Sequence, residues 1–135
     1  MSTLDTALQK AVTSIPECVA AGYVDLSSGM ILSMKTVDSH PGEVFDLLAA
    51  ATTDLFQGAN VTAIEKIFRK ARGLPENHDE HYFQEMIVNS NNLIHIFLRG
   101  KRQQQVACFV CRKGANLGMV LTKSRMAMPE IEAAL

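Results

Sequence analysis

Three strand-like runs that follow one another closely near the end of the chain constrain the fold most. They span Tyr82 to Val88, Leu93 to Leu98 and Gln105 to Cys111. The connections between them, residues 89–92 and 99–102, contain polar residues and one glycine and have the length of hairpin loops. We therefore predict three neighbouring antiparallel strands in the last third of the chain.

The segment after these strands predicts a helix that packs on the sheet. A short turn leads into the segment from Leu117 to Met128. One stripe of this helix, about 120° wide, has the apolar character that packing on a sheet requires. The stripe consists of Leu117, Val120, Leu121, Ser124, Ala127 and Met128. Met119 and Met126 point away from it and are either ordinary surface residues or a second contact patch.

The first half of the chain predicts a helix, a hairpin, two further helices and a loop. The first helix is expected at residues 4–15, and the two strands of the hairpin at 18–26 and 30–34. The two further helices are expected at 43–57 and 61–71, and the loop at 73–80. Pro16 ends the first helix, and Pro41 lies close to the start of the second, where a missing N–H group is harmless. Runs of strands interrupted by helices are typical of an α+β fold. We predict the order α-β-β-α-(α)-β-β-β-α, with a single antiparallel five-stranded sheet and helices on its faces.

Composition narrows the class of protein. The chain has 135 residues, 47% of them hydrophobic, and a formal net charge of −1, which fits one globular domain and argues against nucleic-acid binding. It contains no apolar run of about 18 residues and no signal-like start, so we expect a cytoplasmic protein without membrane insertion. Cys18, Cys108 and Cys111 are expected to be reduced thiols.

The second helix predicts self-association. Its apolar side chains cover about 200° of the wheel, whereas packing on one sheet requires about half that width. We expect the excess, mainly Phe45, Ala49 and Phe56, to be exposed in a monomer and covered by a second copy in a homodimer.

Two short motifs suggest a family. Asn116-Leu117-Gly118 follows an apolar strand, and Gly22-Tyr23-Val24-Asp25 leads into the turn at Ser28-Gly29-Met30. Together with the element order, these motifs resemble a bacterial-like member of the Roadblock family (dynein light-chain Roadblock type). The resemblance covers nearly the whole chain, so we expect a single domain over residues 1–135. The segment from Val61 to Glu80 is longer than the corresponding connection in that family.

The resemblance implies a dimer that serves as a platform for small Ras-like GTPases or for motor and scaffold assemblies. We expect a non-enzymatic module without a cofactor, which regulates or scaffolds such a partner. The second helix and, by resemblance, the first of the three strands would form the dimer interface. The expected interface residues are Phe45, Leu48, Ala49, Thr52, Phe56, Tyr82, Gln84, Met86 and Val88.

Two motifs suggest redox or metal-binding chemistry as alternatives. Cys108 and Cys111 have the spacing of a redox dithiol, but residues i and i+3 of a strand point to opposite faces, and core packing is the favoured interpretation. The stretch from His78 to His81 contains two imidazoles and two carboxylates, which leaves a metal- or ligand-binding sensor as the alternative function. Ser27 and Ser28 are expected in a turn and not as nucleophiles. From these interpretations together, we predict no catalytic residue and no metal site.

Basic residues form two local clusters. Lys66, Arg69, Lys70 and Arg72 lie on the third helix, and Arg99, Lys101 and Arg102 lie at a hairpin tip. Each cluster is either a solvated surface or a docking site for an acidic protein. The weaker candidates for partner binding are therefore Met119, Met126, Arg69 and Lys70.

Overall fold

A computed structural model describes residues 3–38, 42–73, 81 and 83–135. Its elements, in chain order, are α1 (Thr3–Ser14), β1 (Cys18–Asp25), β2 (Met30–Thr36), α2 (Gly42–Gln57), α3 (Ala59–Ala71), β3 (Glu85–Asn89), β4 (Leu93–Arg99), β5 (Gln105–Arg112) and α4 (Leu117–Ala133). This confirms the predicted α+β class and the predicted order of elements. Within these described residues, no helix combines the length and apolar content needed to cross a membrane.

The five strands form one antiparallel sheet in the order β2-β1-β5-β4-β3. The central pair joins distant parts of the chain, because Gly22 of β1 lies opposite Cys108 of β5. The β1–β2 turn forms as predicted, with Gly29 at φ +71° and with the Ser27 and Ser28 hydroxyls both donating to the Asp25 carboxylate at 2.9 Å. These serines therefore stabilise a turn.

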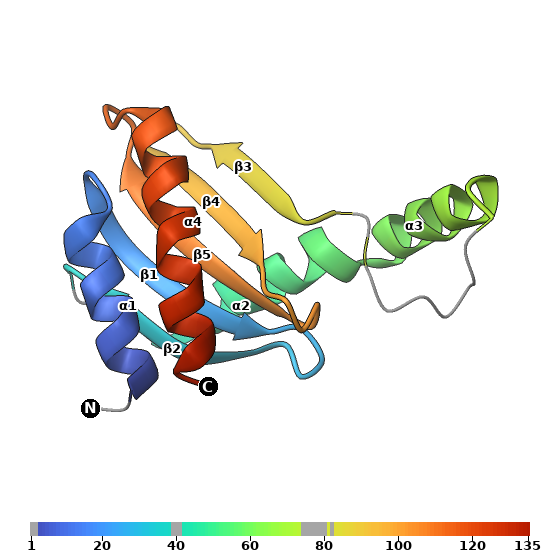
Figure 1. Ribbon diagram of the computed structural model, residues 1–135, viewed down its shortest axis with the longest axis horizontal. Coiled ribbons are helices and arrows are strands. Elements are labelled where there is room, and N and C mark those ends of the chain that lie inside the picture. The colour runs from blue at the N-terminus through green and yellow to red at the C-terminus, as the bar shows by residue number, and fades with distance from the viewer. Residues whose placement is uncertain (1–2, 39–41, 74–80, 82) are drawn as a thin grey trace.

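Helices α1 and α4 cover one face of the sheet (Figure 1). Their buried residues, which include Leu8, Val120 and Ile131, pack with Tyr23 and Phe109 of the sheet into the larger apolar cluster. The predicted stripe of α4 is correct at Val120, Ser124 and Met128, which are all buried. It is wrong at Leu117, which is 39% exposed, because this residue begins the helix.

The opposite face is covered by α2. A smaller cluster there contains Ala49 and Phe56 of α2 together with Phe97, Val106 and Cys108 of the sheet. Figure 1 shows α2 behind the sheet and α3 beyond the β3 side, at the far end of the molecule from α1. The two faces of the sheet are thus covered unequally.

Several predicted boundaries shift; helix α4, for example, ends at Ala133 and not at Met128. The strand expected from Tyr82 to Val88 begins at Glu85 and ends at Asn89, and Tyr82 lies outside the described residues. Helix α3 begins at Ala59, two residues before its predicted start, directly after Gly58. Pro41, expected near the start of the second helix, and residues 74–80 of the expected loop also lie outside the described residues.

Candidate functional site

Helix α2 has the predicted over-wide apolar surface, but its exposed part is not the expected one. Ala49 and Phe56 are 1% and 0% exposed, so the expectation that they are exposed in the protomer is wrong. Thr52, also named for the interface, is 3% exposed and donates its hydroxyl hydrogen bond to the Leu48 carbonyl at 2.8 Å. The spacing of 49, 52 and 56 puts these residues on one side of a helix, and this side packs on the protomer's own sheet.

The opposite edge of the same arc is exposed. Leu47, Leu48 and Leu55, which we call the α2 stripe, are 71%, 39% and 38% exposed. The side chain of Phe45 is outside the described part of the structure. The exposed apolar surface of α2 therefore consists of these leucines and not of Ala49 or Phe56.

Strand β3 lies at the edge of the sheet and pairs with β4 on one side. Ile87 and Val88 are exposed, whereas Met86 is half-buried and packs against the smaller cluster. Gln84 precedes the strand, and its side-chain amide donates to the Gln103 side chain at 2.9 Å. Of the predicted interface residues in this segment, Met86 and Val88 thus lie in the edge strand itself.

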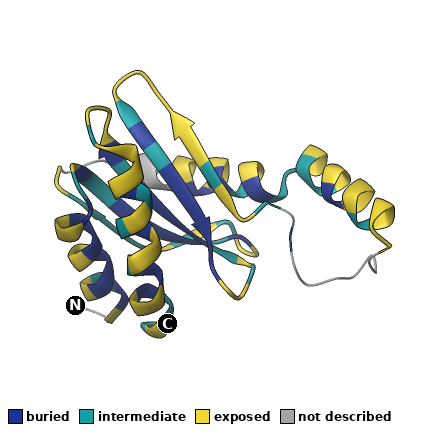
Figure 2. Ribbon diagram, turned by 45° about the horizontal axis from the view of Figure 1, so that its top comes forward, coloured by how far each residue is buried: buried dark blue, intermediate teal, exposed yellow. Residues whose placement is uncertain are grey.

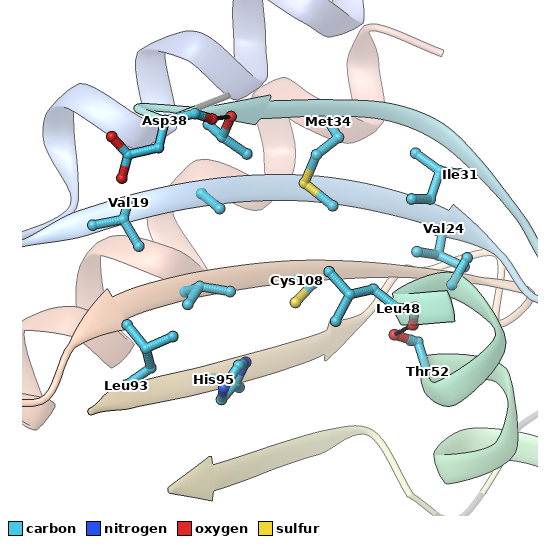
Figure 3. Close-up of a pocket in the computed structure, with 14 residues that line it drawn as sticks. Val19, Val24, Ile31, Met34, Asp38, Leu48, Thr52, Leu93, His95 and Cys108 are labelled. Atoms are coloured by element: carbon cyan, nitrogen blue, oxygen red, sulfur yellow. Dashed lines mark hydrogen bonds between the residues drawn. The ribbon is translucent and has the colours of Figure 1, made fainter. Parts of the chain in front are cut away.

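Beside α2, the smaller-cluster face of the sheet contains an apolar cavity of about 220 Å³, which we call the open groove. Figure 3 shows Leu48 and Thr52 of α2 on one side of it and His95 on the floor. Other lining residues are Val19, Ala20, Met34, Leu93, Cys108 and Val110, and Asp38 lies at one end. The His95 ring stacks on Phe97 with centroids 6.4 Å apart, and burial lowers the pKa of His95.

A buried polar cluster connects α2, α3 and β4. Arg99 is only 7% exposed, which corrects its prediction as part of a polar hairpin tip. Its guanidinium donates to the backbone carbonyls of Phe83 at 2.9 Å, Phe56 at 3.2 Å and Gln103. It also lies 5.0 Å from the centroid of the Phe56 ring, a cation–π distance. Burial lowers the pKa of Arg99, and Glu65 opposes that shift.

Glu65 completes this cluster. It is 2% exposed, and both its carboxylate oxygens lie 3.2 Å from the His81 Nδ1 atom. Sequence reasoning missed Glu65, since an isolated acid among basic residues suggests surface. The Arg99 position could have been found from strand alternation, because it shares a face with buried Phe97 two residues earlier.

Apolar side chains of α3 are exposed to an unusual degree. Ile64, Ile67 and Phe68, which lie on one side of the helix, are 41%, 66% and 37% exposed. Glu65 is the buried residue among those of this helix. Arg69 is half-buried and Lys70 exposed.

The remaining partner-binding candidates lie elsewhere. Met119 and Met126 are 46% and 65% exposed on α4, the helix that covers the other face of the sheet. Figure 2 shows the outer sides of α4 and α3 as largely exposed. The structure therefore does not bring the two methionines together with Arg69 and Lys70 into one patch.

The cysteines are buried and free. Cys111 belongs to the larger cluster and Cys108 to the smaller, which confirms that they point to opposite faces of the sheet. Burial raises the pKa of Cys108 to about 12, and a hydrogen bond with Cys18 together with burial raises the pKa of Cys111. Such thiols resist the ionisation on which redox chemistry depends.

The histidine-rich stretch provides one described member, His81, which is engaged with Glu65. Its residues 78–80 fall outside the described part of the chain. Among the residues that the structure describes, no group of three or more His, Cys, Asp or Glu side chains is arranged to hold a metal ion.

Comparison with known proteins identifies the fold. No protein-family model and no curated protein matches the sequence. Among solved structures, Myxococcus xanthus MglB superposes with a TM-score of 0.70 at 15% identity, over 98% of this chain and 94% of that one. An MglB structure with a tetrameric arrangement has a TM-score of 0.68 at 19% identity, over 98% of this chain and 90% of that one. A Roadblock/LC7 domain from Streptomyces avermitilis has a TM-score of 0.66 at 12% identity, over 96% of this chain and 94% of that one.

These likenesses extend over nearly the whole length of both chains. The fold is therefore of the Roadblock type, as the sequence motifs predicted. Among these neighbours it is similar to MglB and to the Roadblock/LC7 domain alike. At identities this low the comparison establishes the fold alone.

Replacing Arg99 by methionine should destabilise the protein strongly. The change leaves the carbonyls of Phe56, Phe83 and Gln103 without their donor and removes the cation opposite Glu65, at a cost of about 3–5 kcal/mol in the free energy of unfolding. Urea denaturation followed by circular dichroism measures it. Exposed Arg102→Met is the matched control and should change stability by less than about 0.5 kcal/mol. Equal stabilities of the two variants would contradict the role assigned to Arg99.

The native cysteines should react slowly with a thiol reagent. Because all three are buried and the pKa of Cys108 is raised to about 12, modification requires opening of the core and should be at least about 100-fold slower than in urea. A Lys101→Cys variant provides an exposed thiol that reacts at once. Rapid labelling of Cys108 in the folded wild type would instead favour a thiol oxidoreductase.

Proposed function

We propose that the chain is a single Roadblock-like domain, residues 1–135, that forms a homodimer and acts as a non-enzymatic platform for a small Ras-like GTPase in the cytoplasm. The observation that carries the dimer is the α2 stripe, whose three leucines are exposed, together with the position of β3 at the edge of the sheet. Exposed apolar patches and edge strands are both sites where chains associate.

The magnitudes indicate that both elements are required. Covering the exposed fractions of Leu47, Leu48 and Leu55 would contribute about 2–4 kcal/mol per protomer. Association costs about 4–15 kcal/mol in lost freedom of motion. The stripe alone therefore leaves little surplus, and antiparallel pairing of β3 with its copy supplies hydrogen bonds and side-chain contacts from Val88 and Ile87.

The structural roles of the candidate catalytic groups support a non-enzymatic function. Ser27 and Ser28 stabilise a turn through Asp25, and Cys108 and Cys111 fill the core. One of the similar MglB structures has a tetrameric arrangement, which supports self-association in proteins of this fold. The GTPase partner rests on the Roadblock resemblance.

The wild-type chain should sediment as a dimer at micromolar concentration, and Leu47→Asp should shift it to a monomer. Leu47 is 71% exposed, so the protomer should stay folded while a charge enters the apolar interface. The control is Met30→Asp on β2, which is 64% exposed at the other edge of the sheet and should leave the dimer intact. A monomeric wild type, or equal behaviour of both variants, would contradict the proposed interface.

Affinity capture from the native cytoplasm should recover a small Ras-like GTPase, and recovery should depend on whether GTP or GDP is present. We expect the Met119→Lys, Met126→Lys double variant to retain the partner, because exposed single methionines are common on protein surfaces and need not mark a contact. Loss of the partner in that variant would move the contact to α4. Recovery of no GTPase with the wild type would contradict the platform role.

A further inference from the structure

We infer that the apolar side of α3 docks into the open groove of a second copy, so that each protomer of the dimer covers the uncovered sheet face of the other. This inference rests on the homodimer proposed above and adds the segment that fills the groove. It concerns two apolar surfaces that a single protomer leaves apart.

The first surface is the α3 stripe, formed by Ile64, Ile67 and Phe68. Recurrence at i, i+3 and i+4 puts these side chains on one side of the helix. In the protomer, the main contact of α3 with another element is with α2, and its buried residue is the charged Glu65. A helix of 13 residues with such a stripe gains stability mainly by packing that stripe on something apolar.

The second surface is the open groove. Helix α2 covers Val106 and Phe97 on this face but leaves a cavity over β1, β5 and β4, floored by residues such as Ala20, Val110 and His95. In Figure 3 the labelled side chains line a concave, mostly apolar surface beside α2. It is therefore suited to an apolar helix face.

The geometry of the sheet brings the two surfaces together. Helix α3 lies beyond the β3 side of the sheet (Figure 1). If two copies pair through β3 about a two-fold axis perpendicular to the sheet, the same face of each sheet points the same way. The region beyond β3 is then occupied by the partner's sheet. Helix α3, which continues the path of α2, consequently extends over the partner's smaller-cluster face.

The lengths agree with this arrangement. A 13-residue helix is about 20 Å long at 1.5 Å per residue. Neighbouring strands are about 4.8 Å apart, so α3 spans about four of them. Counted from β3 of the partner, four strands are β3, β4, β5 and β1. The last three of these contribute to the floor of the open groove.

Charge also fits. Asp38 lies at one end of the groove and is exposed. Lys66 and Lys70 flank the α3 stripe on the side away from Glu65, where they would remain at the wet rim of the contact. An apolar centre with charged residues at the rim is the usual composition of such an interface.

The test compares two double variants of the full chain by sedimentation equilibrium. Ile64→Gln with Ile67→Gln puts amides on the α3 stripe and should raise the dimer dissociation constant at least about tenfold. Lys66→Gln with Lys70→Gln puts the same residues on the polar side and should raise it by less than about threefold. All four positions are exposed, and urea unfolding of each variant checks that the protomer remains folded.

Cross-linking locates the contact. A chain carrying both Ile67→Cys and His95→Cys, treated with a short bismaleimide, should give a covalent dimer, whereas either single variant and the wild type should not. A link within one chain would mean that α3 folds back onto its own sheet, and it would overturn the inference. So would a groove that still takes up an apolar dye in the dimer.

The two proposals fail in different ways. A monomeric wild type removes the homodimer and this inference together. A wild-type dimer in which the two double variants dissociate equally, and in which no covalent dimer forms, removes only the docking of α3.

Discussion

The antiparallel pairing of β1 with β5 holds the structure together. It brings residues 18–25 against residues 105–112, and the two strands form the middle of the sheet. Their side chains are buried on both faces, with Tyr23 and Phe109 in one cluster and Val24 and Val106 in the other. Each apolar cluster depends on this pairing, because every helix that covers the sheet packs on side chains that the two strands present.

Unequal covering of the sheet is the feature from which function is inferred. Two helices, α1 and α4, close one face, whereas α2 closes only part of the other. The remaining apolar surface is distributed over the open groove, the α2 stripe and the α3 stripe. Single exposed apolar residues are common on proteins, but several exposed apolar surfaces on one small domain indicate a place where chains meet. The proposed role as a binding module rests on these surfaces.

The Arg99 cluster determines where α3 can be. The guanidinium of Arg99 bonds the carbonyl of Phe56 at the end of α2 and the carbonyls that flank β3 and β5. Glu65, in the middle of α3, is buried beside it with His81. A charge-assisted cluster of this kind requires its full set of partners, so it fixes the position of α3 while leaving the apolar stripe exposed.

Periodicity along the chain predicts the elements and, for most of them, the side that is buried. Alternation along β5 separates Cys108 from Cys111, and the stripe of α4 identifies Val120, Ser124 and Met128 as buried, because the period of a strand or helix decides which side chains share a face. Which part of the α2 arc is buried depends on how the helix packs in the folded protein. Ala49 and Phe56 face the sheet, and Leu47 does not, since an arc of about 200° offers two equally apolar sides and the position of the helix on the sheet selects one. The partners of Glu65 and Arg99 also depend on the tertiary structure, because they lie far away in the chain. Alternation along β4 predicts the buried side of Arg99 but not the carbonyl groups that it bonds.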